Sequence, residues 1–460
     1  MAGMVVKNNM SAINTLNTLN KNHGALSKSL QKVSSGMRIN SAADDASGYA
    51  ISERMRVQIR SLDQDNRNTQ NGNSMMKVAE GAVSSTVEIL KTLKEKVINA
   101  ANDTNTDSDR QQIQKELDQS IDQINDNANV TYNGKYLVDG SHNRAVNATG
   151  ATPAEGTKTH LTNQSMNKTT TWTTKLTQLQ SRSGDDLNIH TGDTVTLSIV
   201  QEGKTYTTTY TINSTNADLS TIVDKAQSAK CGSETLGAKI EKVVTGSGTN
   251  DLKGWNIGSG PSNTMVSTAD LGSAVSIKAS GAGIKNQIAG FTISITDKDG
   301  NINKSANAVL DNFNESIRAQ NASSDNAIVL QTGTKANQAI KVGLTDMRAQ
   351  ALGLQGADGQ TLNVSTQKNA NAAINVLDNA IQKALDQQTT IGAIESRLEY
   401  TSTNLTTASE NVTASESTIR DADMAKEMTE YTKNNVLLQA AQSMLAQANQ
   451  NSSSVLSLLQ

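Results

Sequence analysis

The stretch MKVAEGAVSSTVEILKTLKEKVINA, residues 76–100, carries the strongest periodic signal in this chain. Apolar and small residues recur in it at spacings of three and four for more than three heptads: Met76, Ala79, Val83, Thr86, Leu90, Leu93, Val97 and Ala100. A stripe this narrow is typical of a helix that packs along another helix rather than over a broad globular core. The stretch therefore predicts a long helix that needs a helical partner.

The same pattern extends to both ends of the chain. Towards the C-terminus, stripes run from Ile374 to Leu385 and from Ile391 to Ile419. The N-terminal stripe consists of Leu16, Leu19, Leu26, Leu30, Val33 and Met37, and the last C-terminal stripe consists of Leu437, Ala441, Leu445 and Ala448. Because heptad segments at both ends bracket the middle of the chain, we predict that the two ends pair with each other as antiparallel helices.

The segments around residues 76–100 are also predicted to be helical. Residues 51–62 carry an apolar stripe, whereas residues 63–74 are polar and interrupt it. A third helix follows, with Ser108 as its N-cap. Asn133–Gly134 then predicts the tight turn of a β-hairpin.

The middle of the chain, from residue 141 to about 320, has a different composition. It is rich in Gly, Ser and Thr and contains both tryptophans, both phenylalanines and the single cysteine. Residues 195–199 and 206–212 alternate between apolar and polar on either side of a turn, and residues 291–295 alternate in the same way, so we predict a β-hairpin and a further strand. The predicted fold is mainly α with a β-rich insert: a long antiparallel helical bundle formed by the N- and C-terminal segments, and a central β-rich domain.

Composition and charge exclude several classes of protein. The net charge of −3 leaves no basic field for binding nucleic acid. No run of about 18 apolar residues is present, so we expect no membrane insertion. The N-terminus lacks the apolar region and cleavage site of a secretory signal peptide.

The inventory of reactive residues argues against an enzyme. The four histidines include no His-Glu-x-x-His pair, which is the spacing that holds a catalytic zinc ion. Cys231 has no histidine nearby in the sequence that could activate it. The acidic turn at residues 297–300 lacks the other spaced carboxylates of a calcium loop. We therefore expect no catalytic residue, no metal and no cofactor.

Two end segments resemble a known family, the bacterial flagellins. LNKNHGALSKSLQKVSSGMRINSAADDASGYAISERM, at residues 19–55, resembles the N-terminal signature of that family, and NNVLLQAAQSMLAQANQNSSSVLSLLQ, at residues 434–460, resembles its C-terminal signature. The resemblance covers about residues 1–140 and 325–460. It implies a structural subunit that polymerises with copies of itself into the bacterial flagellar filament, for motility.

The resemblance also implies a location and partners. Members of the family are exported unfolded through the flagellar type III apparatus, served by an export chaperone, and they assemble beneath a cap protein. We therefore expect a secreted, extracellular protein of the bacterial flagellum, and this export route would explain the missing signal peptide.

The family plan divides the chain into three regions. The regions would be terminal inner-tube helices from residues 1–42 and 417–460, a helical rod domain with the β-hairpin from residues 43–140 and 325–416, and a variable surface-exposed outer domain from residues 141–324. The changes of composition along the sequence agree with these boundaries.

We predict that the terminal stripes and the apolar C-terminal tip form the assembly interface between copies of the chain. The expected interface residues are Leu16, Leu19, Leu26, Leu30, Val33, Met37, Leu437, Leu445, Val455, Leu456, Leu458 and Leu459. A terminal helix with a narrow apolar stripe has little stability by itself. We therefore expect the terminal segments to be disordered in the monomer and to fold when neighbouring copies cover them.

One segment matches the patch that the flagellin-sensing Toll-like receptor reads in this family. The segment is Lys91–Ile98, and its expected receptor contacts are Thr92, Lys94, Glu95 and Lys96. Receptor-activating members of the family carry arginine at the position of Thr92 and leucine at that of Lys96. We therefore predict that this chain activates the innate immune receptor weakly.

Two non-enzymatic alternatives also fit the helical ends: a hook–filament junction protein, and a secreted coiled-coil adhesin unrelated to motility. Junction proteins share the end helices with flagellins only loosely, whereas both end signatures match here over long stretches. Abundance separates a flagellin from a junction protein, because flagellin should dominate the protein sheared from cells and a junction protein should be scarce.

Overall fold

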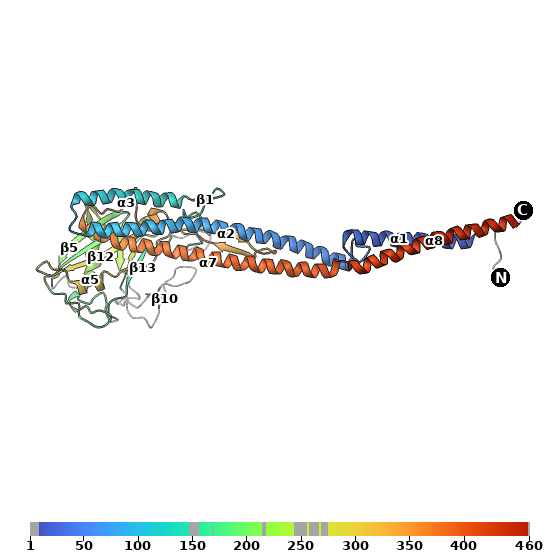
Figure 1. The fold of residues 1–460 in the computed structure, drawn as a ribbon. Helices are drawn as coiled ribbons and strands as arrows, with labels where there is room; N and C mark the ends of the chain where they lie inside the picture. Colours follow the sequence, from blue (N-terminus) through green and yellow to red (C-terminus); the bar gives the residue numbers. More distant parts are fainter. Residues whose placement is uncertain are drawn as a thin grey trace. The chain divides into compact units, whose positions relative to one another are not determined.

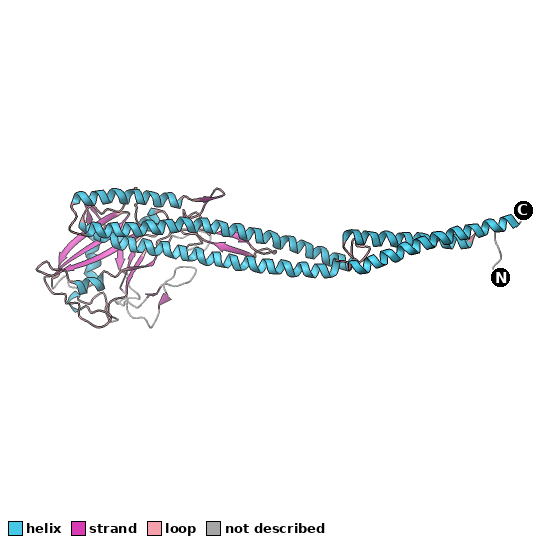
Figure 2. Ribbon diagram, viewed as in Figure 1, coloured by secondary structure: helices cyan, strands magenta, loops and turns pink. Residues whose placement is uncertain are grey.

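The computed structural model describes residues 9–146, 156–167, 169–213, 218–242, 255–256, 266–267 and 275–458. The chain is mainly α with a β-rich middle, as the sequence predicts (Figures 1 and 2). The long helices are α1 (Met10–Ser35), α2 (Ala46–Ala101), α3 (Asp107–Ala128), α7 (Gln367–Arg420) and α8 (Met424–Leu458). The short helices are α4 (Ser220–Gln227), α5 (Lys304–Leu310), α6 (Ala349–Leu352) and the 3-10 turns η1 (Leu176–Gln178), η2 (Gly237–Lys239) and η3 (Ile284–Asn286).

The strands of the described residues form two larger sheets and three two-stranded ones. The five-stranded sheet has the order β12 (Ile288–Thr296), β4 (Thr194–Gln201), β5 (Lys204–Thr211), β6 (Lys230–Cys231) and β7 (Glu234–Thr235). The four-stranded sheet has the order β13 (Asn314–Ile317), β3 (His160–Asn163), β11 (Val275–Ala279) and β8 (Ile240–Lys242). The two-stranded sheets pair β1 (Thr131–Tyr132) with β2 (Lys135–Tyr136), β9 (Trp255–Asn256) with β10 (Val266–Ser267), and β14 (Ile328–Gln331) with β15 (Ala339–Val342). The assigned strand pairs are antiparallel.

The chain divides into two compact units. The first contains residues up to Gln70, the segment Gln331–Gln338 and residues from Glu399 onward, and the second contains Asn71–Leu330 and Ala339–Leu398. Helices α2 and α7 contribute residues to both units.

In the first unit, α1 and α8 lie side by side and run antiparallel (Figure 1). Near the start of α1, the side chain of Asn9 donates a hydrogen bond of 3.2 Å to the backbone oxygen of Ala448. Nearer its end, Ser29 accepts one of 3.1 Å from the side chain of Asn434. The pairing of the two chain ends, predicted from their heptad stripes, is therefore confirmed.

Helix α2 keeps its buried stripe through the polar stretch. Leu62, Asp65, Thr69 and Gly72 are buried in turn at heptad spacing. The predicted interruption at residues 63–74 is therefore wrong: the stripe continues in polar and small residues. The Thr69 hydroxyl is satisfied at its buried position because it donates to the Asp65 backbone oxygen at 2.8 Å, and Gly72 leaves room for a neighbour. Burial raises the pKa of the Asp65 carboxyl.

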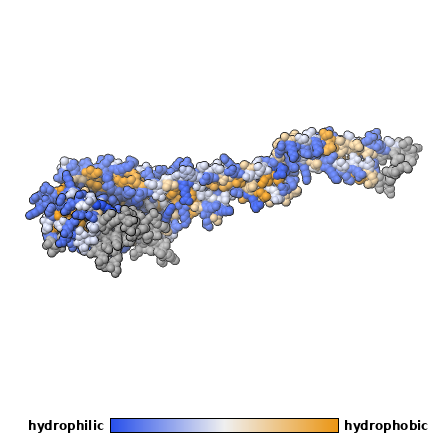
Figure 3. All heavy atoms as spheres, turned by 90° about the horizontal axis from the view of Figure 1, so that it is seen from below, coloured by the Kyte–Doolittle hydropathy of each residue, from blue (hydrophilic) through white to orange (hydrophobic). Residues whose placement is uncertain are grey.

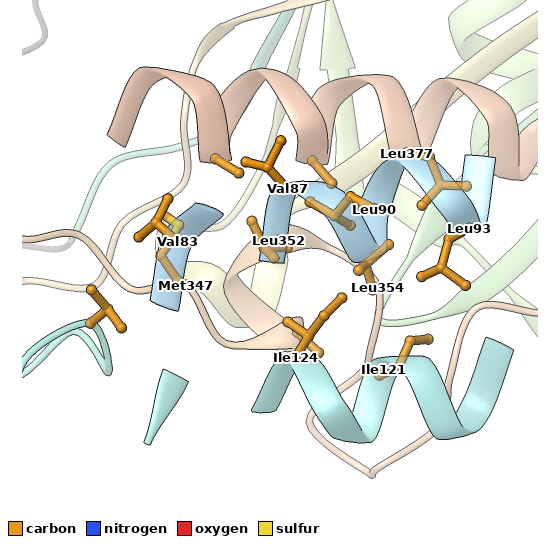
Figure 4. Packing of buried hydrophobic residues seen from close by; sticks show 14 of the residues in the cluster. Val83, Val87, Leu90, Leu93, Ile121, Ile124, Met347, Leu352, Leu354 and Leu377 are labelled. Atoms are coloured by element: carbon orange, nitrogen blue, oxygen red, sulfur yellow. The ribbon is translucent and has the colours of Figure 1, made fainter. Parts of the chain in front are cut away.

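The helical core of the second unit is built on the stripe of residues 76–100. Each of the eight predicted stripe residues is at most 1% exposed. In Figure 4, Leu90 of α2 lies between Leu377 of α7 and Ile124 of α3. The helical partners that the stripe requires are thus provided by α7 and α3.

Helix α3 is capped by a reciprocal pair that the sequence analysis missed. The Asp109 backbone N–H donates to the Thr106 hydroxyl at 3.3 Å, and the Thr106 N–H donates to the Asp109 carboxylate at 2.9 Å. The prediction of Ser108 as N-cap is therefore wrong. The Thr106 position is better because its capping box satisfies two backbone donors at once.

Both predicted β-hairpins form. Asn133 and Gly134 turn the β1–β2 hairpin with φ of 50° and 76°. Glu202 and Gly203 turn the β4–β5 hairpin with φ of 52° and 72°. Two consecutive residues with positive φ are the mark of the primed turn that suits the twist of a hairpin.

The β-rich region has its own core but also shares the helical one. Trp172 and Phe291 are buried in the β-rich core. Val200 of β4 and Ala289 of β12 belong instead to the helical core. Next to Ala289, a side chain on Gly290 would come within 2.7 Å of a methyl group of Val376 on α7, so glycine allows β12 to approach the helix closely.

Candidate assembly surface

The buried stripe of α8 passes through Leu438, Ala441, Leu445 and Ala448. Ala441 and Ala448 are buried, whereas Leu438 and Leu445 are half-buried. The neighbouring Leu437, which the sequence analysis placed on this stripe, is 42% exposed. Counting back from Ala448 in strict steps of three and four residues reaches Leu438, so this signal was present in the sequence.

The predicted stripe of α1 is covered only in part. Leu19, Leu26, Val33 and Met37 are half-buried. Leu16 and Leu30 remain 45% and 52% exposed. Ser29 is the one residue of α1 that is fully buried, so this helix has no large apolar side chain in a closed core.

Large apolar side chains therefore remain in contact with solvent on both terminal helices. On α1 they are Met10, Ile13, Leu16 and Leu30, and on α8 they are Met424, Met428, Val436, Leu437 and Met444. Figure 3 shows apolar residues, in tan and orange, interspersed with polar ones over the terminal helices. Exposed apolar surface of this extent on a helix pair is typical of a protein–protein interface.

The C-terminal tip is described only in its backbone. Helix α8 continues through Val455 and Leu456 to Leu458. The predicted interface residue Leu459 lies outside the described residues. The assignment of these four apolar residues to the interface stays a prediction.

The segment predicted to meet the immune receptor lies on α2. Thr92 and Glu95 are exposed. Lys94 forms an ion pair with Asp378 of α7, and Lys96 forms one of 3.1 Å with Glu116. Two of the four expected contacts therefore have partners within the chain.

No three His, Cys, Asp or Glu side chains of the described ranges come together in a way that could hold a metal ion. Among the described helices, none is both long and apolar enough to cross a membrane. What the described chain presents instead is apolar surface on paired terminal helices. Apolar surface of this kind is typical of a protein that associates with other proteins.

Comparison with known proteins identifies the family. Residues 6–143 match the bacterial flagellin N-terminal helical region, and residues 374–459 match the bacterial flagellin C-terminal helical region. The chain is 33% identical over 450 residues to a flagellin of Clostridium tyrobutyricum, a match that covers 97% of this chain and 99% of the relative. It is 29% identical over 476 residues to a flagellin of Bacillus subtilis strain 168, covering 99% and 100% of the two chains. Among solved structures, FliC from Burkholderia pseudomallei is 19% identical with a TM-score of 0.24, over 71% of this chain and 99% of that one.

The chain therefore belongs to the bacterial flagellin family, and it is a structural subunit of the flagellar filament. Neither alternative, the junction protein or the adhesin, is favoured. The family is a structural one, in keeping with the expectation that the chain is not an enzyme.

Proposed function

We propose that copies of this chain polymerise through the apolar faces that α1 and α8 leave exposed after pairing with each other. The observation that carries this proposal is the solvent-exposed set on these two helices, which includes Met10, Ile13, Val436 and Met444 at 45% to 62% exposure. Covering such side chains favours association by roughly 1.5–3 kcal/mol for each one fully buried. A contact between two different faces that repeats without closing into a ring produces a helical polymer.

Folding and assembly are coupled in this proposal. Apart from Ser29, α1 buries no residue fully, and most helical stability comes from packing rather than from the helix itself. The terminal segments would therefore be disordered in the free subunit and would order when neighbouring copies cover them.

The proposal divides the chain into three regions by role. Residues 1–42 with 417–460 form the inner tube, residues 43–140 with 325–416 the rod domain, and residues 141–324 the outer domain. The breaks between α1 and α2 and between α7 and α8 support the first boundary. The proposal also includes export through the flagellar type III apparatus with a chaperone, assembly beneath a cap protein and an extracellular location. Membership of the flagellin family supports this part of the proposal.

Assembly can be tested directly. Purified protein is concentrated and examined by electron microscopy, with sedimentation to measure the polymerised fraction. Long, uniform helical filaments are expected. Protein that stays monomeric under conditions in which the Bacillus subtilis flagellin polymerises would contradict the proposal.

The division of roles predicts that the central region is dispensable for polymerisation. Val146 N–H donates to the Ser323 backbone oxygen at 3.0 Å, so the ends of residues 141–324 lie close enough for a short linker to replace them. The deletion protein should form filaments, because the faces of α1 and α8 are untouched. It should also melt at a lower temperature, because removing Val200 alone takes about 1.5–3 kcal/mol of burial from the helical core.

The measurements for this deletion are electron microscopy and a thermal melt followed by circular dichroism. A deletion protein that is soluble and helical but forms no filaments would show that the division of roles is wrong.

Weak activation of the flagellin-sensing receptor is a second, separable proposal. Thr92 lacks the planar multidentate donor of arginine, and the charge of Lys96 is engaged by Glu116. Changing Thr92→Arg and Lys96→Leu together should raise signalling in reporter cells, with Lys115→Leu on α3 as a control for loss of a lysine elsewhere. Unchanged protein that already signals as strongly as an agonist flagellin would contradict this proposal.

A further inference from the structure

The two helix breaks of the first unit lie against each other. Helix α1 ends at Ser35 and is followed by Gly36 in the left-handed conformation, with φ of 70°. Helix α7 ends at Arg420, and α8 starts anew where the Asp423 carboxylate accepts the Ala425 N–H at 3.0 Å. The connection between α1 and α2 therefore lies beside the connection between α7 and α8.

Backbone hydrogen bonds join the two connections. Arg38 N–H donates to the Arg420 oxygen at 2.7 Å, and Ala422 N–H donates to the Gly36 oxygen at 3.0 Å. Between them, Met37 and Asp421 form an antiparallel bridge. The end of α1 and the start of α8 are therefore held at one relative position along the chain.

The side chain of Arg420 extends this junction to the start of α2. It is buried, and one guanidinium nitrogen donates to the Glu53 carboxylate at 2.6 Å and lies 3.4 Å from the Ser52 hydroxyl. Its Nε lies 3.1 Å from the sulfur of Met37, and its Cζ lies 5.4 Å from the centre of the Tyr49 ring. The hydrogen bond from Arg420 also lowers the pKa of the Glu53 carboxyl. Arg420, at the end of α7, thus contacts both the start of α2 and the connection that follows α1.

The α1–α8 seam specifies its own register only weakly. Its fully buried residues are Ser29 on α1 and the small Ala441 and Ala448 on α8. Stripes that repeat every seven residues can also slide by one heptad and still bring apolar residues together. Fully buried large side chains that interlock would oppose such a slip, but the large apolar residues of this seam, such as Leu26, Leu438 and Leu445, are only half-buried.

We infer that Arg420 is the positioning residue that fixes the register of α1 against α8. It holds the junction from which both helices depart, so it determines which exposed residues of α1 stand beside which residues of α8. If the proposed polymerisation through these faces holds, Arg420 also sets the surface that each copy offers to the next.

Engineered disulfides can report this register. In a Cys231→Ser background, Ser29→Cys with Asn434→Cys reports the native register, because these side chains lie 3.1 Å apart. Ser29→Cys with Ala441→Cys reports a register shifted by one heptad. Cross-linking is measured under mild oxidation on the full chain, before and after concentration to polymerising conditions, and helical parameters are measured by electron microscopy.

With Arg420 intact, the native pair should cross-link and the shifted pair should not. With Arg420→Ala, the native cross-link should fall several-fold, the shifted one should appear, and any filaments should lose their uniform twist. Arg420→Lys should behave like Arg420→Ala, because an ammonium group keeps the charge but lacks the guanidinium fork. Arg54→Ala, which removes an exposed arginine beside Glu53, is the matched control and should leave both yields unchanged.

The outcomes separate this inference from the proposed function and from a purely stabilising role. An Arg420→Ala chain that melts earlier but keeps the native cross-link overturns the inference, as does a wild-type chain that never forms that cross-link. A wild-type chain that forms the native cross-link but no filaments leaves the register assignment standing and contradicts polymerisation instead.

Discussion

Replacing Val436, Leu437 and Met444 of α8 with aspartate is expected to abolish polymerisation and to leave the subunit folded. These side chains are 58%, 42% and 62% exposed in the subunit, so the change removes little of the subunit's own packing. In the polymer, each lost apolar contact costs roughly 1 kcal/mol, about half of the value for a fully exposed side chain, because about half of each side chain is already covered in the subunit. Each new carboxylate would also have to lose its water without a partner. A penalty of several kcal/mol repeated at every subunit contact should prevent growth.

Sedimentation and electron microscopy measure the loss of filaments, and a thermal melt by circular dichroism measures the fold. The matched control places the same three charges at exposed polar positions of α8, with Gln439→Asp, Gln442→Asp and Gln447→Asp. The control should still polymerise at moderate salt, because it removes no apolar contact. Normal filaments from the Val436, Leu437 and Met444 variant would remove this face of α8 from the assembly interface.

Truncating Lys383 to alanine is expected to cost roughly 3–5 kcal/mol of folding free energy, the usual penalty for leaving a buried charge without its partner. Lys383 of α7 lies 3.1 Å from the carboxylate of Glu315 on β13, and the two side chains are 6% and 5% exposed. Burial lowers the pKa of the Lys383 ammonium and raises that of the Glu315 carboxyl. Each charge of the pair therefore offsets part of the cost of burying the other.

The cost of this truncation should depend on pH. With Lys383 gone, only the positive charge of Arg318 opposes the effect of burial on Glu315, so the pKa of this carboxyl in the folded state lies above its value in the unfolded chain. A carboxyl whose pKa is raised by folding lowers the free energy of unfolding as pH rises from its pKa in the unfolded chain to its pKa in the folded protein. The Lys383→Ala protein should thus be closer to wild type in urea unfolding at pH 5 than at pH 8.

Two comparisons test the assignment of this effect to the buried pair. Lys383→Met combined with Glu315→Leu should recover most of the stability, because apolar residues of similar volume need no partner. Arg318→Ala, which removes the more exposed ion pair with Asp386, should cost about 1 kcal/mol or less. A loss below about 1 kcal/mol for Lys383→Ala would mean that water reaches Glu315 readily.

Periodicity predicted the helices well where apolar residues carried it. The stripe from Met76 to Ala100 is buried as predicted, because a repeat of seven residues places these side chains on one face of a helix whatever its partner is. The β4–β5 hairpin was predictable for a similar local reason: residues that alternate on both sides of a turn can share one buried face. Periodicity failed at Asp65 and Thr69, because polar residues at buried positions carry no apolar signal.

The sequence by itself determined the fold class, the pairing of the chain's ends and the character of the terminal helices, since all three depend on local spacing and composition. Only the tertiary structure decided that Lys383 meets Glu315 and that Arg420 reaches Glu53. These contacts join residues that are distant in the chain, and many residues of suitable charge compete for each one. Burial and backbone position select the partners, and neither can be computed from spacing along a single helix.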